Sequence, residues 1–444
     1  MQIVLEKTPA VSFLLGKQST STATVYRRAS FCVVTEVGGH GIAYNTLTKE
    51  LADLDSSELE LLSRDEIGVT DKSIPFIQGY YLVPLDHDDE KLCDGVLAFI
   101  RSAVKSDDVY RRFTVFPTTD CNARCFYCYE LGRAHLPMSA ETAEKTAQFI
   151  IKASHRSPVS ITWYGGEPLM NTDAMDIISA ALEKSGMAYS SRLVTNASLI
   201  DDEIIRKAKK LWHVEKVQVS LDGTSDVYDR IKAYTDRESG FETVLCNIGK
   251  LLDNDIKVNI RLNIDIHNID NIHALCDVLV SRFGGRSGLN VYSELLFDCE
   301  GARRPVSSPD DRLRLAKELI SLEDKCALCG LLRPRKLRRV ENVSFCKADA
   351  PDSLVITAEG NLVKCDFFTD ERFAGNVYDG VDKAKLDAEA DAFTKRVKCR
   401  GCTAYPVCLR SAGCPTGGCD AARKYITEQR LIRSIRYVYT KERS

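Results

Sequence analysis

Residues 113–128 have the sequence FTVFPTTDCNARCFYC, and this stretch decides how the chain is interpreted. Phe113–Pro117 is a short apolar run that predicts a strand, and Cys121, Cys125 and Cys128 follow it on a tight loop. Three thiolates in this arrangement can bind three irons of a [4Fe–4S] cluster and leave the fourth iron open to a small molecule. Zinc is the alternative, but a closed zinc site needs four ligands, and the loop has no histidine or fourth cysteine.

The sequence around this loop alternates between short apolar runs and helical patterns over residues 111–300. Six runs predict parallel strands: Phe113–Pro117, Val159–Tyr164, Arg192–Thr195, Val217–Leu221, Lys257–Ile264 and Leu289–Leu296. Helical patterns lie between them, at Ala140–Ala153, Ala174–Lys184, Asp201–Leu211, Phe241–Leu252 and Asn271–Phe283. We expect an α/β fold, a partial (β/α)6 barrel of the TIM type, with its site at the C-terminal strand ends.

The regions on either side of the barrel differ from it. Residues 1–110 predict a small α+β domain, with strands at Phe31–Glu36 and Ile42–Tyr44 around a glycine-rich turn. Residues 301–425 lose the repeat, and nine of the seventeen cysteines lie between Cys326 and Cys419. Residues 426–444 predict a C-terminal helix. Clustered cysteines in so large a chain indicate metal or redox chemistry rather than disulfides.

Composition excludes several classes of partner. A net charge of -3 gives no reason to expect nucleic acid or a membrane surface. No stretch approaches the ~18 apolar residues of a membrane span, and the N-terminus makes a poor signal peptide. We therefore expect a cytoplasmic protein.

The cysteine loop resembles the signature of the radical S-adenosylmethionine (SAM) superfamily, including Tyr127 before the third cysteine. Three later motifs match that family in order, each at a predicted strand end: Gly165-Gly166-Glu167-Pro168, Val194-Thr195-Asn196 and Ser220-Leu221-Asp222-Gly223. The resemblance covers about Phe113 to Leu296. It implies a SAM site made by Tyr127, Gly165, Gly166, Glu167, Asn196, Ser220 and Asp222, with the GGEP motif at the amino group. The family's SAM-holding arginine corresponds here to either Arg230 or Lys232.

The cysteines of residues 326–425 resemble the SPASM domain, which holds two auxiliary [4Fe–4S] clusters. The resemblance implies Cys346, Cys365 and Cys414 for the first cluster, and Cys399, Cys402, Cys408 and Cys419 for the second. The spacing departs from the family's pattern here, which leaves the assignment of Cys414 and Cys419 open. The fourth ligand of the first cluster is Cys326, Cys329 or no protein group. A zinc ribbon at Cys399 and Cys402 is the alternative, but zinc has no use for seven or more thiolates.

Asp366 directly follows Cys365. In anaerobic sulfatase-maturing enzymes, which resemble this chain in both cluster domains, an aspartate at this place is thought to deprotonate the substrate. The resemblance makes Asp366 a candidate general base. A structural role in capping the next turn is the alternative.

Residues 1–110 resemble the winged-helix leader-recognition domain of peptide maturases, which captures a leader peptide by strand addition, here at Phe31–Glu36. A structural cap over the barrel is the alternative. The resemblances together imply an oxidoreductase with three [4Fe–4S] clusters that cleaves SAM to methionine and 5′-deoxyadenosine. Its substrate would be a ribosomally synthesised precursor peptide, its product a Cys thioether, and its electron donor flavodoxin- or ferredoxin-like. Alternatives are a carbon–carbon crosslink, a formylglycine-generating sulfatase maturase, a non-catalytic iron–sulfur scaffold and a zinc-dependent binding module.

Overall fold

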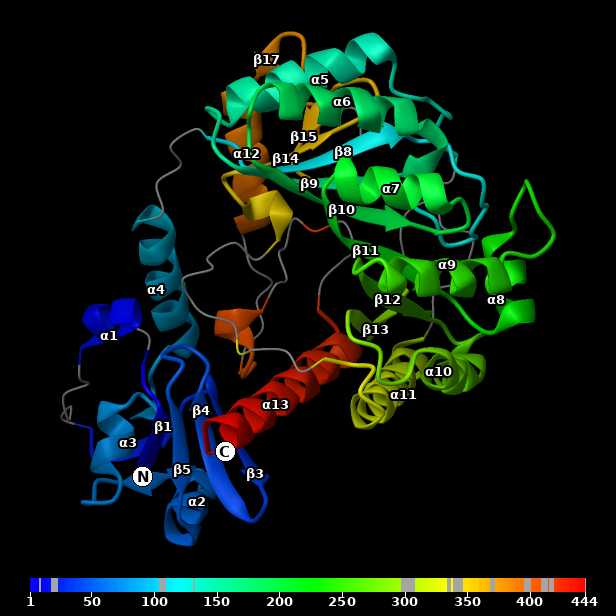
Figure 1. Cartoon of the computed structure of the whole chain (residues 1–444). Helices are drawn as coiled ribbons and strands as arrows, with labels where there is room; N and C mark the ends of the chain where they lie inside the picture. The colour runs from blue at the N-terminus through cyan, green and yellow to red at the C-terminus, as the bar shows by residue number, and fades with distance from the viewer. Residues whose placement is uncertain are drawn as a thin grey trace.

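An eight-stranded sheet forms the centre of the upper part of the molecule (Figure 1), with the strand order β13-β12-β11-β10-β9-β8-β14-β15. The structure is a computed structural model. It describes residues 1–7, 9–16, 23–103, 109–130, 132–296, 308–333, 337, 346–367, 372–394, 401–408, 414 and 419–443.

Six parallel strands of this sheet follow one another in sequence order. They are β8 (Arg112–Thr118), β9 (Val159–Gly165), β10 (Tyr189–Thr195), β11 (Val214–Leu221), β12 (Lys257–Ile264) and β13 (Leu289–Leu295). The helices between them are α5 (Ala140–Ala153), α6 (Thr172–Lys184), α7 (Asp202–Lys210), α8 (Ser225–Lys232), α9 (Phe241–Asp253) and α10 (Ile269–Phe283), with the 3-10 helix η1 (Pro168–Asn171) before α6. The predicted strands and helices agree with these bounds to within three residues, and the α/β partial barrel is confirmed. Helix α8 was not predicted from the sequence.

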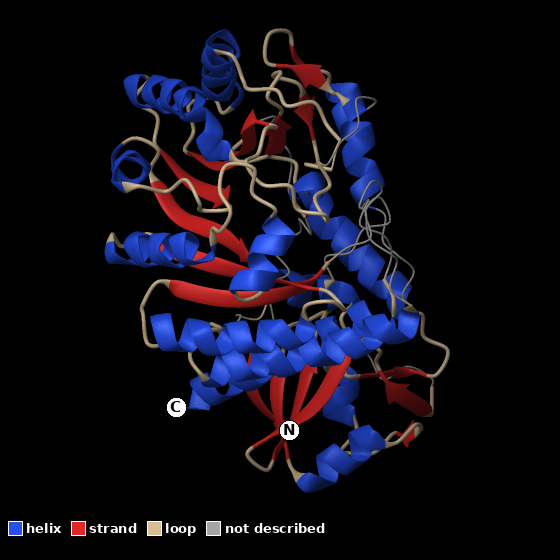
Figure 2. Cartoon of the chain, turned by 90° about the vertical axis from the view of Figure 1, so that its right-hand side faces the viewer, coloured by secondary structure: helices blue, strands red, loops and turns tan. Residues whose placement is uncertain are grey.

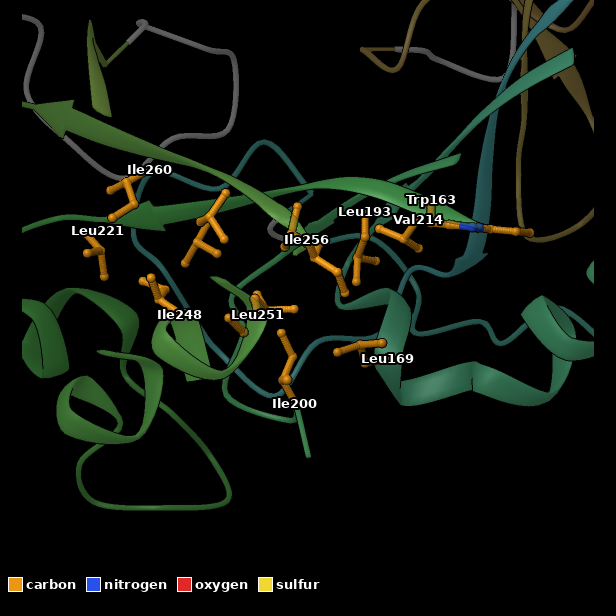
Figure 3. Packing of buried hydrophobic residues seen from close by; sticks show 14 of the residues in the cluster. Trp163, Leu169, Leu193, Ile200, Val214, Leu221, Ile248, Leu251, Ile256 and Ile260 are labelled. Carbon is orange, nitrogen blue, oxygen red and sulfur yellow. The ribbon is translucent and has the colours of Figure 1, made fainter. Parts of the chain in front are cut away.

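The main core lies between the sheet and these helices. Burial alternates along the strands, so that Val159, Ile161 and Trp163 of β9 are buried while the residues between them are only partly covered. Figure 3 shows strand residues such as Trp163 and Ile260 in one layer with Ile248 and Leu251 of α9. The other strand face is therefore left for polar side chains that line the barrel interior.

Two further strands extend the sheet beyond β8. β14 (Ser353–Ile356) pairs in parallel with β8, and β15 (Leu362–Val363) pairs antiparallel with β14. This segment lies in the region expected to be cysteine-rich, where no strand was predicted from the sequence. All four residues of β14 are buried, so the run has no two-residue alternation to reveal it.

The N-terminal unit contains two small sheets. One has the order β1 (Gln2–Leu5), β5 (Leu51–Leu54), β4 (His40–Asn45), β3 (Cys32–Val37), and the other the order β6 (Ile67–Gly68), β2 (Val25–Arg28), β7 (Leu82–Pro84). Its helices are α1 (Pro9–Leu15), α2 (Ser56–Ser63), α3 (Ile74–Gln78) and α4 (Asp89–Ala103). The predicted hairpin is present, because Gly38 and Gly39 take positive φ angles of 57° and 83° between β3 and β4.

A long C-terminal helix joins the N-terminal unit to the barrel. α13 (Ala421–Arg443) packs on α11 (Pro309–Leu328) and on β3 (Figure 1). Figure 2 shows helices lying between the strands of the N-terminal sheet and those of the large sheet. Arg430 and Arg433 of α13 share the buried Glu323 of α11, both at 2.7 Å.

The other described C-terminal elements are short. They are η2 (Lys347–Asp349), β16 (Gly375–Asn376), β17 (Gly380–Val381), α12 (Lys383–Thr394) and η4 (Tyr405–Val407). Among the residues described, no helix combines the length and apolar character needed to cross a membrane.

Candidate active site

A cavity of about 220 Å³ lies at the C-terminal ends of β9 to β12 and beside the cysteine loop. Nine of the predicted site residues line it: Cys121, Cys125, Tyr127, Cys128, Gly165, Gly166, Asn196, Ser220 and Lys232. Glu167 and Asp222 are fully buried behind its wall, and Arg230 is exposed on α8. Of the two alternatives for the SAM-holding cation, the structure places only Lys232 at the cavity.

The cysteine loop is fastened to the barrel through Asn122. The Asn122 side chain donates to Ser198 Oγ and Asp236 Oδ2, both at 3.0 Å, and accepts from Asn196 Nδ2 at 2.8 Å. Thr235 N donates to the backbone carbonyl of Asn122 at 2.8 Å. The polar residue between the first two cysteines therefore fixes where the thiols point.

Gly165 and Gly166 are required by the backbone of the same loop. An added Cβ on Gly165 would overlap the Thr118 carbonyl oxygen, and one on Gly166 would overlap that of Asp120. Gly165 also has a φ of 115°, a conformation that residues with a side chain rarely adopt. The glycine pair thus lets the end of β9 lie against the segment that leads into Cys121.

Glu167 connects the ends of two strands. Its carboxylate accepts from Thr195 Oγ1 at 2.7 Å, from Asn196 N at 2.8 Å and from Leu169 N at 3.2 Å. Burial raises the pKa of Glu167 in spite of these donors. The carboxylate is committed to β10 and η1 and does not line the cavity, so its predicted contact with the SAM amino group stays a prediction.

A buried ion pair fixes the charge at the cavity wall. Lys232 Nζ lies 2.8 Å from Asp222 Oδ2 and donates to Ser220 Oγ at 2.7 Å. Tyr127 from the cysteine loop also donates to Asp222, at 2.9 Å, and Asn263 donates to it at 2.8 Å. Burial alone would lower the pKa of Lys232, but the Asp222 carboxylate holds that pKa well above its usual value. Asp222 therefore acts through Lys232 and keeps it protonated.

The cavity fits a cluster with one open iron. Burial raises the pKa of Cys121 to about 12 and that of Cys128 to about 11, which a bound metal would reverse by deprotonating the thiols. Each thiolate of a cubic cluster binds a different iron, so the three sulfurs need not converge on one point. Among the described residues, no group of three His, Cys, Asp or Glu side chains could hold a single metal ion.

One side of the cavity consists of residues that were not predicted from the sequence. Tyr129, Glu130, Tyr164, Arg261 and Phe367 line it together with Gln218 and Asn263. Tyr129 stacks on Phe367, with ring centroids 4.2 Å apart, and so joins the cysteine loop to the C-terminal region. Burial raises the pKa of Glu130 to about 7, against the opposing effect of Arg133. The signal that could have found Arg261 and Asn263 is a polar residue at every second position of an otherwise apolar strand.

Asp366 lies next to this side without lining the cavity. Its carboxylate accepts from Lys347 Nζ at 2.8 Å, while the adjacent Phe367 reaches the cavity wall. The negative charge of Asp366 contributes to the raised pKa of Glu130. The charge of Cys346 contributes to the raised pKa of Cys365, so the two thiols lie near each other. The catalytic role of Asp366 and this ligand pair stay predictions.

The remaining predicted cluster ligands differ in burial. Cys402 is buried in an apolar cluster of the N-terminal unit, and Cys408, Cys414 and Cys419 are partly buried. Cys399 lies outside the described residues. Cys326 faces Cys276 of α10 with 3.3 Å between the sulfurs, and Cys329 is exposed at the end of α11. Because α11 packs on β13 and Cys365 follows β15, these two thiols lie at the opposite sheet edge from Cys365 and are not brought to it.

Residues 115–279 match the model of the Radical SAM superfamily. This segment contains the cysteine loop and every strand end that builds the cavity up to Asn263. Residues 115–279 form a radical SAM domain. A radical SAM domain implies one [4Fe–4S] cluster and SAM, and the loop and cavity described above provide the donors for both.

Curated relatives of this domain carry out different named reactions. Fe-coproporphyrin III synthase of Methanosarcina barkeri is 32% identical over 163 residues, which are 36% of this chain and 39% of that protein. A probable GTP 3′,8-cyclase of Methanocaldococcus jannaschii is 30% identical over 172 residues, 37% of this chain and 55% of that protein. The chain thus spans about two-fifths to just over half of these relatives.

Solved structures resemble a larger part of the chain. The protein anSMEcpe, with bound AdoMet and the Cp18Cys peptide, has a TM-score of 0.59 at 16% identity and covers 75% of this chain and 99% of its own. SuiB of Streptococcus suis, bound to the precursor peptide SuiA, has a TM-score of 0.51 at 15% identity and covers 89% and 99%. At these identities the likeness concerns the fold, which in SuiB extends over most of this chain.

Proposed function

We propose that the protein is a radical SAM enzyme that modifies a ribosomally synthesised precursor peptide, most simply by forming a thioether from a cysteine side chain. The observation that supports this most is a single cavity in which the three loop thiols and Lys232 face a wall of aromatic and polar side chains. When bound, the cluster supplies the electron that cleaves SAM to methionine and the 5′-deoxyadenosyl radical.

The chain's own residues position SAM and exclude water. Ser220 and the protonated Lys232 provide a donor and a positive charge for the methionyl carboxylate. Gly165 and Gly166 let the SAM amino group approach the backbone. Asn196 and Asn122 brace the loop that carries the thiols.

The N-terminal unit supports a peptide substrate. β3, which contains most of the segment expected to capture a leader, is the last strand of its sheet among the described residues. An edge strand offers unpaired backbone groups to an extended peptide. SuiB, whose fold this chain resembles, has been solved with a precursor peptide. The alternative role of the N-terminal unit is that of a structural cap over the barrel.

The auxiliary clusters belong to this proposal too. We assign Cys346, Cys365 and Cys414 to the first, and Cys399, Cys402, Cys408 and Cys419 to the second, with the order of Cys414 and Cys419 open. A flavodoxin- or ferredoxin-like protein would supply electrons. The named reactions of the curated relatives are not transferred, because their matches cover 25% to 37% of this chain.

A mass measurement tests the proposed reaction. The reconstituted protein is incubated anaerobically with SAM, a reductant and the peptide encoded beside it. The proposal predicts 5′-deoxyadenosine together with a peptide that has lost two hydrogen atoms and no longer reacts with a thiol reagent. Loss of hydrogen with the thiol intact would favour a carbon–carbon crosslink. Conversion of a sulfatase cysteine to formylglycine, with the encoded peptide unchanged, would contradict the proposal and favour the second candidate, which the fold likeness to anSMEcpe supports.

A further inference from the structure

Glu130 has a buried carboxylate to which no described residue donates a hydrogen bond. Its side chain lines the cavity, the residue is 8% exposed, and neither carboxylate oxygen has a hydrogen-bond partner among the described residues. An unsatisfied buried polar group costs about 1–3 kcal/mol, and more when it is charged. Native proteins pair nearly all such groups, so a pair of orphaned oxygens at a cavity indicates a missing ligand.

Arg261 presents the complementary donor to the same cavity. Its Nε is buried and has no hydrogen-bond partner within the described part of the chain. The other cation of the cavity wall, Lys232, is already committed to Asp222 and Ser220. Arg261 therefore offers an unused N–H donor and a positive charge to whatever enters.

Neither residue is among those expected to bind SAM, although Arg261 lies beside one of them, Ser220, on the neighbouring strand β12. Glu130 follows Tyr129, whose ring stacks on Phe367 of the C-terminal region. The expected SAM contacts are Tyr127 on the cysteine loop, the ends of β9, β10 and β11, and Lys232. The unused acceptor and donor are thus left for the second molecule that must enter the cavity, the substrate.

We propose that Glu130 and Arg261 hold one backbone peptide group of the substrate, with the carboxylate accepting its N–H and the guanidinium donating to its carbonyl oxygen. The inference rests on the proposed peptide substrate and adds the chemical group that is recognised. An amide carries a donor and an acceptor in fixed relation, which matches one free acceptor and one free donor in a single cavity. Both are positioning residues that set which peptide atoms face SAM.

Binding of small amides tests this without turnover. The reconstituted, SAM-loaded protein is titrated with 3-mercapto-N-methylpropanamide and, separately, with the corresponding ester, methyl 3-mercaptopropanoate, and binding is followed by ligand-observed NMR. The ester lacks the N–H and keeps the carbonyl. The wild-type protein should bind the amide at least about tenfold more tightly, because the N–H meets a carboxylate. Glu130→Met should remove this difference, and Glu130→Gln, which keeps an acceptor, should retain part of it.

Arg261→Met gives an independent prediction. Both probes keep the carbonyl, so this variant should weaken the binding of both by a similar factor and leave the ratio of their affinities unchanged. The exposed Glu144→Met and Arg192→Met are matched controls and should behave like the wild type. SAM affinity, measured by equilibrium dialysis, should stay within about twofold in all variants, since neither residue is assigned to SAM.

Several outcomes would overturn the proposal. These are equal affinities of the wild type for amide and ester, no detectable binding of either, or a tenfold loss of SAM affinity in Glu130→Met or Arg261→Met. If Glu130→Met does not fold, the ratio of amide to ester affinity in the wild type and the titrations of Arg261→Met still test the proposal. Failure of the proposed function is seen separately, as a wild-type protein that leaves the precursor unmodified whatever these affinities are.

Discussion

At the scale of single residues, the Asp222–Lys232 pair is the best-defined part of the site. Both side chains are almost completely buried, and each satisfies the other. Lys232→Met should leave the Asp222 carboxylate buried without its counter-charge, which costs about 3–5 kcal/mol and lowers the melting temperature. SAM affinity should fall with it, because the positive charge at the cavity wall is lost.

Arg230→Met is the matched control for this prediction. It changes a cation two residues away on the same helix, but one that is exposed and outside the cavity lining. We expect stability within about 0.5 kcal/mol of the wild type and unchanged SAM affinity. If Arg230→Met loses SAM affinity and Lys232→Met retains it, the assignment of the cation is wrong.

How far the site could be predicted also differs by residue. Cys121, Gly165 and Ser220 could be predicted from the sequence because a motif and a predicted strand end coincide at each of them. Glu130 and Arg261 belong to no motif. Their significance depends on the lack of a hydrogen-bond partner for the Glu130 carboxylate and for Arg261 Nε in the described part of the chain, which only the packed structure reveals. For Glu167, the motif indicated a carboxylate at the site but not that strand-end donors would occupy it.

At the scale of elements, the site depends on close contact between the end of β9 and the cysteine loop. Gly166→Ala would push a methyl group into the Asp120 carbonyl oxygen. We expect a destabilisation of about 1–3 kcal/mol from this overpacking, and a lower iron content because the loop must move. Thermal unfolding and iron analysis measure the two effects.

Gly249→Ala provides the control for this change. Gly249 lies inside α9, and its added Cβ would meet only Phe283, at an ordinary 3.9 Å. Alanine in a helix interior should stabilise the protein by about 0.5–1 kcal/mol and leave the iron content alone. Equal effects of the two substitutions would contradict the role given to the glycine pair.

The same scale shows where sequence patterns fail. Helices such as α5 were predicted with their correct ends because their apolar residues recur with the helical period. β14 was missed because a four-residue strand buried throughout has no period of its own. Its place depends on pairing with β8, about 240 residues earlier in the chain, which no local pattern encodes.

At the scale of the whole molecule, α13 connects the proposed leader-binding unit to the barrel through Glu323. Glu323→Gln should lower the free energy of unfolding by about 3 kcal/mol, because Arg430 and Arg433 lose the carboxylate that they share. Glu318→Gln on the same helix removes an exposed carboxylate and should cost less than about 1 kcal/mol. Denaturant unfolding of both variants checks the prediction, and equal losses would contradict it.

The contribution of Glu323 to the stability of the fold should also depend on pH. Burial alone would raise its pKa, but Arg430 and Arg433 hold the pKa below its usual value. A carboxyl with a lowered folded-state pKa stabilises above its unfolded pKa of about 4.3 and loses this effect as the pH falls further. The stability gap between wild type and Glu323→Gln should therefore narrow below about pH 4.

The most direct test of the central claim is whether the loop thiols enable SAM cleavage. The wild-type chain and a variant with Cys121, Cys125 and Cys128 all changed to Ala are reconstituted anaerobically and incubated with SAM and a reductant. We predict 5′-deoxyadenosine from the wild type and none from the variant, which should keep about eight of about twelve irons. Production of 5′-deoxyadenosine by the variant, or its absence from a wild-type protein with full iron content, would contradict the account.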